Sequence, residues 1–331
     1  MSIRIIKAGF YSTLQDTGRP GFQSEGVPVC GAMDVDALKY ANMLTGNDEN
    51  SCCIEITLHG AQLACDEDML IALTGGGSRA FVNESEIPFG KAIHIQKGSV
   101  LKFSASPDSC RTYFAVGGGF VLEKTMNSSS TYVAAGFGGL NGKPLQTGDE
   151  LMIGKNESLL TKAITASLPF KQQSFSIASW GLSLARAIAQ RSIRIFEGPE
   201  WNWISETSRE SFDHFYFTIL PSSNRMGLRL QSEKICRVDS KELLSTSVSK
   251  GTIQCTPDGN TILLMADCQT TGGYPRIGQV AAVDLSYCAQ LRAGDRIQFT
   301  RISFAEAERL FLERQQLIGD IKRGIAARFN L

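Results

Sequence analysis

The stretch that decides the fold is Gly251-Thr-Ile-Gln-Cys-Thr-Pro-Asp-Gly-Asn-Thr-Ile-Leu-Leu-Met-Ala-Asp267. Its Thr, Ile and Leu residues lie on both sides of Pro257-Asp-Gly-Asn260, whose four residue types favour the backbone angles of a turn. β-Branched and apolar residues are typical of strands. Short runs of the same kind, separated by Gly, Asp, Asn and Ser, recur along the chain. The sequence therefore predicts a mainly β protein.

One six-residue pattern occurs three times, at Gly98–Phe103, Gly148–Ile153 and Gly294–Phe299. Each copy begins with Gly-Asp or Gly-Ser, which suits a turn, and continues with alternating residues that place one apolar face on a core. We interpret each copy as a turn that leads into a strand. Because copies lie in both halves of the chain, we expect two barrel-like units.

At 331 residues the chain exceeds the size at which one hydrophobic core keeps growing. Residues 156–192 lose the strand alternation, gain Ser, Lys, Gln and Ala, and include a candidate helix at Leu182–Ile188. We therefore expect a β-barrel-like domain at 1–155, a linker at 156–192 and a second β-barrel domain at 193–331.

Two segments have the spacing of amphipathic helices. Asp34–Leu44 repeats Ala and Leu at helical spacing, with acidic residues in its first turn and Gly46 beyond its end. The segment from 304 to about 325 carries an apolar stripe behind a capping pair, Ser303 and Glu306. We predict a short helix at the first segment and a terminal helix at the second.

Charge and composition disfavour several classes of protein. Lys plus Arg and Asp plus Glu are equal at 33 each, so no net charge attracts nucleic acid or an anionic membrane. The first residues show no signal-peptide pattern, and the apolar runs are far shorter than the roughly 20 residues that span a bilayer. We expect a cytoplasmic protein with no nucleic-acid or membrane partner. The nine cysteines include no C-x-x-C pair, which favours reduced, buried thiols.

Several catalytic motifs are absent from the sequence. The phosphate loop is incomplete, because Pro144 follows Gly142-Lys143 where Ser or Thr is required. The glycine clusters do not complete G-x-G-x-x-G, and there is no G-x-S-x-G elbow. His59, His94 and His214 are isolated from one another, so the sequence predicts no metal site.

The sharpest candidate anion site is Arg225-Met-Gly-Leu-Arg229. On a strand the two arginines point to the same face, with Gly227 between them. That gap would let a carboxylate or phosphate meet both guanidinium groups. The alternative is a pair of surface salt bridges, since exposed arginines are common.

A second candidate cluster follows the apolar run 261–266. Asp267 ends that run, and a carboxylate in such a place needs a partner or a purpose. The next residues, Gln269-Thr-Thr-Gly-Gly-Tyr274, are dense in amide, hydroxyl and backbone donors, and their glycines let a ligand lie against the chain. We interpret this segment as the lip of a pocket.

These C-terminal motifs and four N-terminal ones together carry a family resemblance. The N-terminal marks are Gln15-Asp16-Thr-Gly-Arg19-Pro-Gly21, Gly26-Val-Pro-Val-Cys-Gly-Ala-Met-Asp34, Asn42-Met-Leu-Thr-Gly-Asn47 and Glu55-Ile-Thr-Leu-His-Gly60. The C-terminal marks are Arg225–Leu230, Gly251–Gln254, Thr270–Pro275 and Ala289–Asp295. Over nearly its whole length the chain resembles the carboxyltransferase-like family, which includes a component of bacterial ATP-dependent 5-oxoprolinase and the carboxyltransferase domain of urea carboxylase. Its family-motif residues are Asp16, Arg19, Asp34, Asn47 and Glu55.

The resemblance implies two cyclophilin-like β-barrel domains and a site shared with partner chains. It implies conversion of 5-oxoproline to glutamate with a B-type paralogue and an A-type hydrolase as partners, using ATP with magnesium. Cations would bind phosphate and substrate carboxylate, amides would hold the lactam edge, and an acid or base would complete the site. The residues assigned to substrate binding are Arg225, Arg229, Gln254, Gln269, Thr270, Thr271, Gly272 and Gly273, and those assigned to catalysis are Asp267 and Tyr274.

Two departures from the family pattern bear on the substrate, and three alternatives stay open. Ser129 and Cys268 stand where the resemblance leads us to expect arginine, so two positive charges are missing. One alternative is biotin-dependent carboxyl transfer to a urea-like amide, which needs a biotinylated partner because the chain has no biotin-attachment domain. The others are a component of an allophanate-hydrolase type, for which no nucleophile motif is found, and a non-catalytic protein that binds a regulator.

Overall fold

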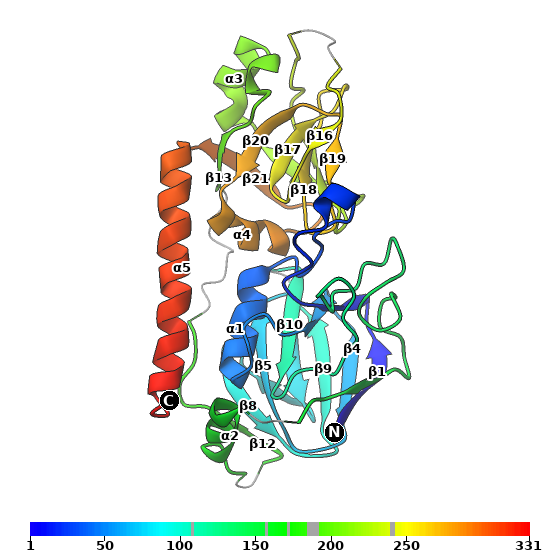
Figure 1. Ribbon diagram of the computed structural model, residues 1–331, viewed down its shortest axis with the longest axis vertical. Coiled ribbons are helices and arrows are strands. Elements are labelled where there is room, and N and C mark those ends of the chain that lie inside the picture. The colour runs from blue at the N-terminus through cyan, green and yellow to red at the C-terminus, as the bar shows by residue number, and fades with distance from the viewer. Residues whose placement is uncertain (107–108, 156–157, 171–172, 184–191, 239–241) are drawn as a thin grey trace. The chain divides into compact units, whose positions relative to one another are not determined.

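The computed structural model describes residues 1–106, 109–155, 158–170, 173–183, 192–238 and 242–331. These residues form a mainly β protein with few helices (Figure 1). The chain divides into two compact units. The first unit comprises Met1–Arg19, Asp34–Arg186 and Gly319–Leu331, and the second comprises Pro20–Met33 and Ala187–Ile318. No helix in the described ranges is both long and apolar enough to cross a bilayer.

The first unit contains two six-stranded sheets whose neighbouring strands are all antiparallel. One sheet has the order β11-β1-β4-β9-β6-β7, formed by Glu150–Met152, Ser2–Ala8, Ala61–Cys65, Val100–Ala105, Ser78–Val82 and Ser85–Ile87. The other has the order β12-β8-β5-β10-β3-β2, formed by Phe175–Ile177, Ala92–Ile95, Met69–Gly75, Arg111–Val116, Cys53–Thr57 and Tyr11–Gln15.

A single buried core joins these two sheets. It includes Leu63 and Phe103 from one sheet and Ile71 and Phe114 from the other. Apolar side chains alternate with outward-facing ones along several strands, so each of these strands gives one face to this core. Burial of that apolar area is the main stabilising contribution in the unit.

Helix α1, Val35–Thr45, packs on β5 and β10 of the first unit (Figure 1). The Asp34 carboxylate accepts the backbone N–H of Ala37 at 3.0 Å and so caps the helix start. Gly46 ends the helix in the left-handed conformation, with φ +74°. The short helix predicted at 34–44 is therefore confirmed.

The second unit is built on a closed barrel of the order β13-β20-β17-β18-β15-β14-β21. These strands are Ser192–Glu197, Arg276–Val280, Thr252–Cys255, Thr261–Leu264, Gly227–Gln231, Phe217–Ile219 and Arg296–Arg301. β13 and β21 pair in parallel and the other neighbours pair antiparallel. Ile195, Phe217, Leu263 and Phe299 fill the barrel together with other apolar side chains. The second half of the chain thus forms the expected barrel.

A two-stranded ribbon stands apart from the barrel sheet. It pairs β16, Thr246–Ser247, with β19, Thr271–Gly272. Further helical segments in the described ranges are α3 (Glu206–Ser211), α4 (Leu285–Gln290), α5 (Phe304–Ala327), and the 3-10 turns η1 (Gln23–Glu25), η3 (Trp201–Trp203), η4 (Phe212–His214) and η5 (Ala282–Asp284). α5 confirms the terminal helix predicted from residue 304.

Three glycine turns follow the sequence pattern. Gly98, Gly148 and Gly294 have φ of +79°, +96° and +92°, and they precede β9, β11 and β21. Glycine adopts positive φ without the steric cost that a Cβ brings. The interpretation of each copy as a turn leading into a strand is therefore confirmed.

The first unit differs from the expected barrel, because its two sheets stay open. β11 and β7 are the edges of one sheet, and β12 and β2 are the edges of the other. Closing a barrel requires a particular stagger and pairing of first and last strands. A turn pattern within one hairpin carries no information on that pairing, so the prediction of two barrels was half correct.

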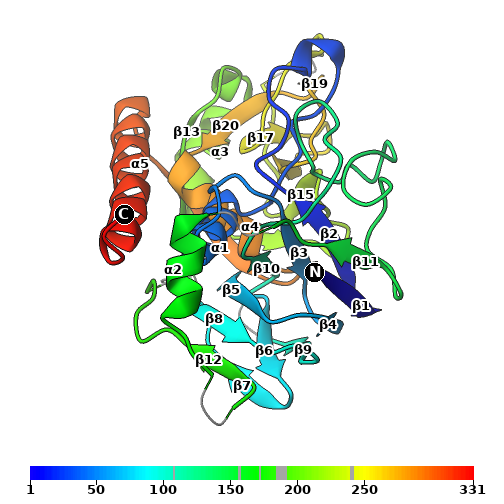
Figure 2. The same ribbon diagram turned by 60° about the horizontal axis from the view of Figure 1, so that its bottom comes forward.

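The middle of the chain contains regular structure of the first unit. α2, Leu159–Ala166, and β12 lie in the range expected to be a linker, and β12 pairs with β8 (Figure 2). The candidate helix at Leu182–Ile188 falls outside the described residues from 184 onward. The domain limits read from the sequence stay a prediction.

The close packing of Gly46 on α2 gives a test of the first unit. A Cβ on Gly46 would lie 2.7 Å from the backbone nitrogen of Thr161, whereas one on Gly98 would meet no atom within 4 Å. Both glycines have φ between +70° and +80°. Gly98→Ala should cost about 1–2 kcal/mol of unfolding free energy, from the left-handed conformation alone. Gly46→Ala should cost about 1–3 kcal/mol more, from overpacking.

Urea unfolding of both variants measures the difference. Equal losses of unfolding free energy in the two variants would show that α2 does not pack tightly against Gly46 at the end of α1.

Candidate functional site

Two residues assigned to different roles, Arg225 and Asp267, form a buried ion pair. Arg225 Nε and Nη2 donate to the two carboxylate oxygens of Asp267 at 2.8 and 2.9 Å. Both side chains are about nine-tenths buried. This two-point geometry is the strong form of a guanidinium–carboxylate contact. The predicted anion-binding arginine therefore already holds an anion, which is the predicted catalytic carboxylate.

The same pair holds an N-terminal segment of the second unit. Arg225 Nη2 also donates to the carbonyl of Gly31 at 2.6 Å. The ammonium of Lys250 donates to the carbonyls of Ala32 and Met33 at 3.2 and 2.7 Å. Met33 itself belongs to the barrel core. Two cations thus fasten three consecutive carbonyls of the Gly26–Asp34 motif.

Arg229 has a different environment. β15 begins at Gly227, so the alternation of a strand does not extend back to Arg225. Arg225 is buried before the strand, and Arg229 is exposed on it. The prediction that the two arginines share a strand face is therefore wrong, although each lies in the second unit.

Two amide side chains converge on the ribbon. Gln254, on β17, is almost fully buried, and its Nε2 donates to the carbonyl of Tyr274 at 3.2 Å. A Cβ on Gly272 would lie 2.7 Å from Gln254 Nε2 and 3.3 Å from Gln269 Nε2. The absence of a side chain at Gly272 therefore lets both predicted amides approach the same stretch of backbone.

The rest of the predicted pocket lip lies on or beside the ribbon. The carbonyl of Thr270 accepts the N–H of Val248 at 3.0 Å, and Thr271 and Gly272 form β19. Gly273 and Tyr274 are exposed. The structure thus brings Gln254, Gln269 and the segment 270–274 together.

A cavity of about 320 Å³ lies beside this cluster. Its lining comes from β16, β13, β17 and β20, and comprises Phe196, Glu197, Gly198, Pro199, Ser247, Val248, Ser249, Thr252, Arg276, Gly278 and Gln279. Arg276 lies opposite Gln254 in the ladder between β20 and β17. Sequence reasoning missed this lining. The sequence signal that could have identified part of this lining is the two-residue period of a strand, which places Thr252 on the same face as Gln254.

Arg276 joins three parts of the second unit. Its Nε and Nη2 donate to the Glu200 carboxylate at 2.8 Å each, and its Nη1 donates to the Ser247 carbonyl of the ribbon at 3.0 Å. The hydrogen bonds from Arg276 lower the pKa of Glu200 below its usual value. The pair thus ties β20 to both the ribbon and the turn before η3.

In the first unit, Asp16 organises a loop of three serines. Its carboxylate accepts the hydroxyls of Ser128 and Ser130 and the backbone N–H groups of Gly18 and Ser129. A buried carboxylate with four donors is well satisfied. This family-motif residue therefore fixes the loop in which Ser129 replaces an expected arginine.

Arg19 supports the same loop from another side. It donates to the Ser130 carbonyl, and its guanidinium lies 4.9 Å from the centre of the Phe137 ring. The side chain is almost wholly buried, and within the described ranges its Nε and Nη1 have no hydrogen-bond partner. Two buried donors are therefore available here.

Asp34 and Glu55 belong to one buried chain of hydrogen bonds in the first unit. The backbone N–H of Asp34 donates to the Tyr113 hydroxyl, which donates to Glu55 Oε2, both at 2.7 Å. Burial, and then the charge of Glu55, raises the pKa of Tyr113, so this hydroxyl stays a donor. These residues are consistent with a structural role.

Asn47 connects the end of α1 to the end of β10. Its side-chain nitrogen donates to the Val116 carbonyl at 2.8 Å, and its oxygen accepts the Gly118 N–H at 3.0 Å. Hydrogen bonds within the first unit thus account for Asp16, Asp34, Asn47 and Glu55, whereas Arg19 keeps two buried donors without a partner in the described ranges.

The cysteines and the residue types that bind metals are further candidates for a site. All nine cysteines are free thiols and eight are buried. Burial raises the pKa of Cys255 and Cys268 to about 11, so these thiols are protonated at neutral pH. Within the described ranges, no group of three or more His, Cys, Asp or Glu side chains could hold a metal ion.

The buried pair predicts unequal effects of the two arginines on stability. Arg225→Met leaves the Asp267 carboxylate buried without its partner and should cost about 3–5 kcal/mol of unfolding free energy. Arg229→Met changes an exposed side chain and should cost less than about 0.5 kcal/mol. The double variant Arg225→Met with Asp267→Leu should recover part of the loss, because neither charge is then buried alone. Denaturant unfolding of the three variants would contradict the buried pair if the two single losses were equal.

The pair of Glu200 and Arg276 predicts a pH dependence. Because the folded pKa of Glu200 is lowered, its stabilising contribution is full above the ordinary Glu pKa of about 4.3 and is lost as pH falls through the folded value. Glu200→Gln should therefore destabilise the protein at pH 7, with a difference from wild type that shrinks in acid. The exposed Glu233→Gln is the matched control. Unfolding midpoints that differ equally at pH 7 and below pH 4 would argue against the pair.

Comparison with known proteins places these features in a family. Residues 25–301 match the family described as carboxyltransferase domain, subdomain A and B. The chain is 36% identical over 305 residues to the C-type subunit of 5-oxoprolinase from Escherichia coli, covering 92% of this chain and 93% of that protein. It is 33% identical over 321 residues to the corresponding 5-oxoprolinase protein of Haemophilus influenzae, covering 97% and 98%.

The fold is also similar to a solved structure. The crystal structure of the K. lactis urea amidolyase superposes with a TM-score of 0.84 and 27% identity, covering 97% of this chain and 20% of the amidolyase. This chain therefore matches one part of that much longer protein. On the family match and the two bacterial relatives, the chain belongs to the carboxyltransferase-domain family and is a homologue of the C-type subunit of 5-oxoprolinase.

Proposed function

We propose that this chain is the C-type subunit of an ATP-dependent 5-oxoprolinase that converts 5-oxoproline to glutamate. The observation that carries the proposal is 36% identity to the E. coli relative along nearly the full length of both chains. Its partners in this proposal are a B-type paralogue and an A-type hydrolase, in the cytoplasm. ATP with magnesium is used by the complex.

The chemical problem is a lactam whose amide resonance resists hydrolysis. The amide oxygen attacks the terminal phosphorus of ATP and releases ADP. Water then adds to the amide carbon, and the phosphorylated oxygen leaves as phosphate. The complex must therefore hold the lactam edge with its oxygen aligned on the phosphoryl group, and stabilise the charge on the phosphoryl oxygens during the transfer. Both tasks call for hydrogen-bond donors and acceptors in fixed positions.

We assign the lactam edge to Gln254 and Gln269. Their side-chain amides approach Gly272 together. The cavity of about 320 Å³ is lined by Thr252, on the same strand as Gln254, and by Ser247, the ladder partner of Thr271. That volume suits a small ligand, since ligand sites span about 300–1,000 Å³. Thr270, Thr271 and Gly273 supply backbone and hydroxyl groups along the ribbon. Tyr274 is exposed and is the acid or base of the proposal.

The charged residues take revised roles in this proposal. Asp267 and Arg225 neutralise each other, so we assign them to positioning of the Gly31–Met33 segment, not to proton transfer. The exposed guanidinium of Arg229 is the cation of the motif that faces solvent, where a substrate carboxylate or a partner chain can reach it. Phosphate contacts then fall mainly to the partner chains.

Carboxyl transfer from biotin to a urea-like amide is the second candidate. It is favoured by the fold similarity to the K. lactis urea amidolyase. Detection of a biotinylated partner that co-purifies with the chain would support it over lactam hydrolysis.

Co-expression with A-type and B-type partners tests the proposal. The complex should release glutamate and hydrolyse ATP when 5-oxoproline is added, and the chain alone should do so at a small fraction of that rate. Within the complex, Gln254→Met should lower kcat/KM for 5-oxoproline about tenfold, because one hydrogen bond to the reacting amide is lost. Glutamate release and ATP hydrolysis are measured together.

Gln298→Met, on the outside of β21, is the matched control and should leave kcat/KM unchanged. Full activity of Gln254→Met would show that the Gln254 amide does not bind the substrate. An inactive wild-type complex that is assembled and folded would contradict the function itself.

A further inference from the structure

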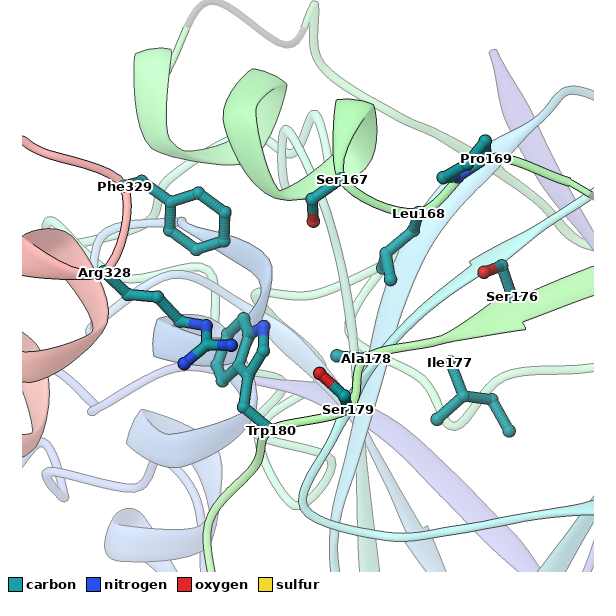
Figure 3. A pocket seen from close by; sticks show the side chains of 10 residues that line it. All are labelled: Ser167, Leu168, Pro169, Ser176, Ile177, Ala178, Ser179, Trp180, Arg328 and Phe329. Carbon is teal, nitrogen blue, oxygen red and sulfur yellow. The ribbon is translucent and has the colours of Figure 1, made fainter.

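A second cavity lies in the first unit, apart from every residue assigned above. It has a volume of about 670 Å³, twice that of the cavity beside the ribbon. Three segments line it, as Figure 3 shows: the end of α2, the strand β12 with the residues after it, and the turn that follows α5. The lining residues are Ser167, Leu168, Pro169, Ser176, Ile177, Ala178, Ser179, Trp180, Arg328 and Phe329.

One wall of this cavity is aromatic. The rings of Trp180 and Phe329 meet edge to face, with centres 5.9 Å apart. Both rings are half-buried and pack on the small core beneath α2, so they are held in place. Leu168 and Pro169 line the cavity from the end of α2 (Figure 3). A flat ring placed between these walls would bury apolar area against both.

The cavity carries one charge, and it is positive. Arg328 is the only charged residue of the lining, and its guanidinium lies 5.7 Å from the centre of the Trp180 indole. Within the described ranges Arg328 forms no ion pair, whereas Arg323, on the preceding helix α5, pairs with Asp320. A guanidinium beside an aromatic wall suits an anion attached to a flat ring.

The strand β12 also gives the cavity polar groups that can bind a ligand. β12 is the edge strand of its sheet, and the backbone pairs of Ser174, Ser176 and Ala178 with β8 leave the intervening residues facing away from the sheet. The N–H and carbonyl groups of Ile177 therefore point to the open edge. With the hydroxyls of Ser176 and Ser179, they give donors and acceptors for the polar edge of a ring.

We propose that this cavity binds an aromatic ring that carries an anionic group. The ring lies against Trp180 and Phe329, and the anion pairs with Arg328. A mononucleotide and an aromatic carboxylate share this chemistry. The proposal does not depend on the reaction assigned to the other unit, because it concerns binding by the chain alone.

Calorimetric titration of the full chain distinguishes a mononucleotide from an aromatic carboxylate as the ligand. The probes are AMP and benzoate, each compared with its neutral counterpart, adenosine or benzamide. We expect saturable binding of at least one anionic probe, at least tenfold tighter than its neutral counterpart. Binding of AMP alone identifies a nucleotide site, and binding of benzoate alone identifies a site for small aromatic acids.

Three variants locate the binding. Arg328→Ala should lower the affinity for the anionic probe about tenfold to a hundredfold, since a charge-assisted hydrogen bond is lost. Ser179→Trp, at an exposed lining position, should fill the cavity and abolish binding. Arg323→Ala is the matched control and should bind as wild type. Thermal melts confirm that each variant is folded.

Several results would overturn the proposal. If neither anionic probe binds saturably, or if each binds no more tightly than its neutral counterpart, the cavity has no anion site. Unchanged affinity in folded Arg328→Ala and Ser179→Trp would place the binding elsewhere.

Discussion

The second unit depends on one buried ion pair, between Arg225 and Asp267. Removing two charges from water costs several kcal/mol per ion, and only excellent geometry with further hydrogen bonds offsets that cost. Here the guanidinium meets both carboxylate oxygens and also the Gly31 carbonyl. Arg225 precedes β15 and Asp267 follows β18, which are neighbouring strands, so the pair closes one end of that strand pair and fastens Pro20–Met33 to the barrel.

In the proposed function, this arrangement leaves recognition of the lactam edge to neutral groups. Arg225 and Asp267 satisfy each other, and the ammonium of Lys250 is engaged by two carbonyls. The groups that gather at the ribbon are the amides of Gln254 and Gln269 and the backbone around Gly272. A lactam is neutral at its reacting bond and presents one donor and one acceptor. Amide side chains can match both, whereas a misplaced charge would leave one of them unpaired.

The sequence predicted features that depend on neighbouring residues. The three glycine turns, the helix capped by Asp34 and the terminal helix each need only a few consecutive residues, and all three were correct. The pairing of Arg225 with Asp267 joins residues 42 apart and depends on which strands are neighbours. For the same reason the open sheets of the first unit and the approach of Gln254 to Gly272 could not be read from local patterns. The error at Arg225 came from placing it on a strand that begins two residues later, at Gly227.

The two positions at which arginine was expected, Ser129 and Cys268, have different surroundings, and only Cys268 lies beside the buried ion pair. Cys268 is buried beside Asp267, and the charge of Lys250 acts on its thiol. An arginine at this position would add a third cation near Arg225 and Lys250, with Asp267 as the carboxylate of the cluster. Ser129 lies in a loop whose backbone is held by Asp16 and by the N–H of Gly139, so the loop needs no long side chain there. In this chain, therefore, neither Ser129 nor Cys268 needs to be an arginine for the contacts that shape its unit to form.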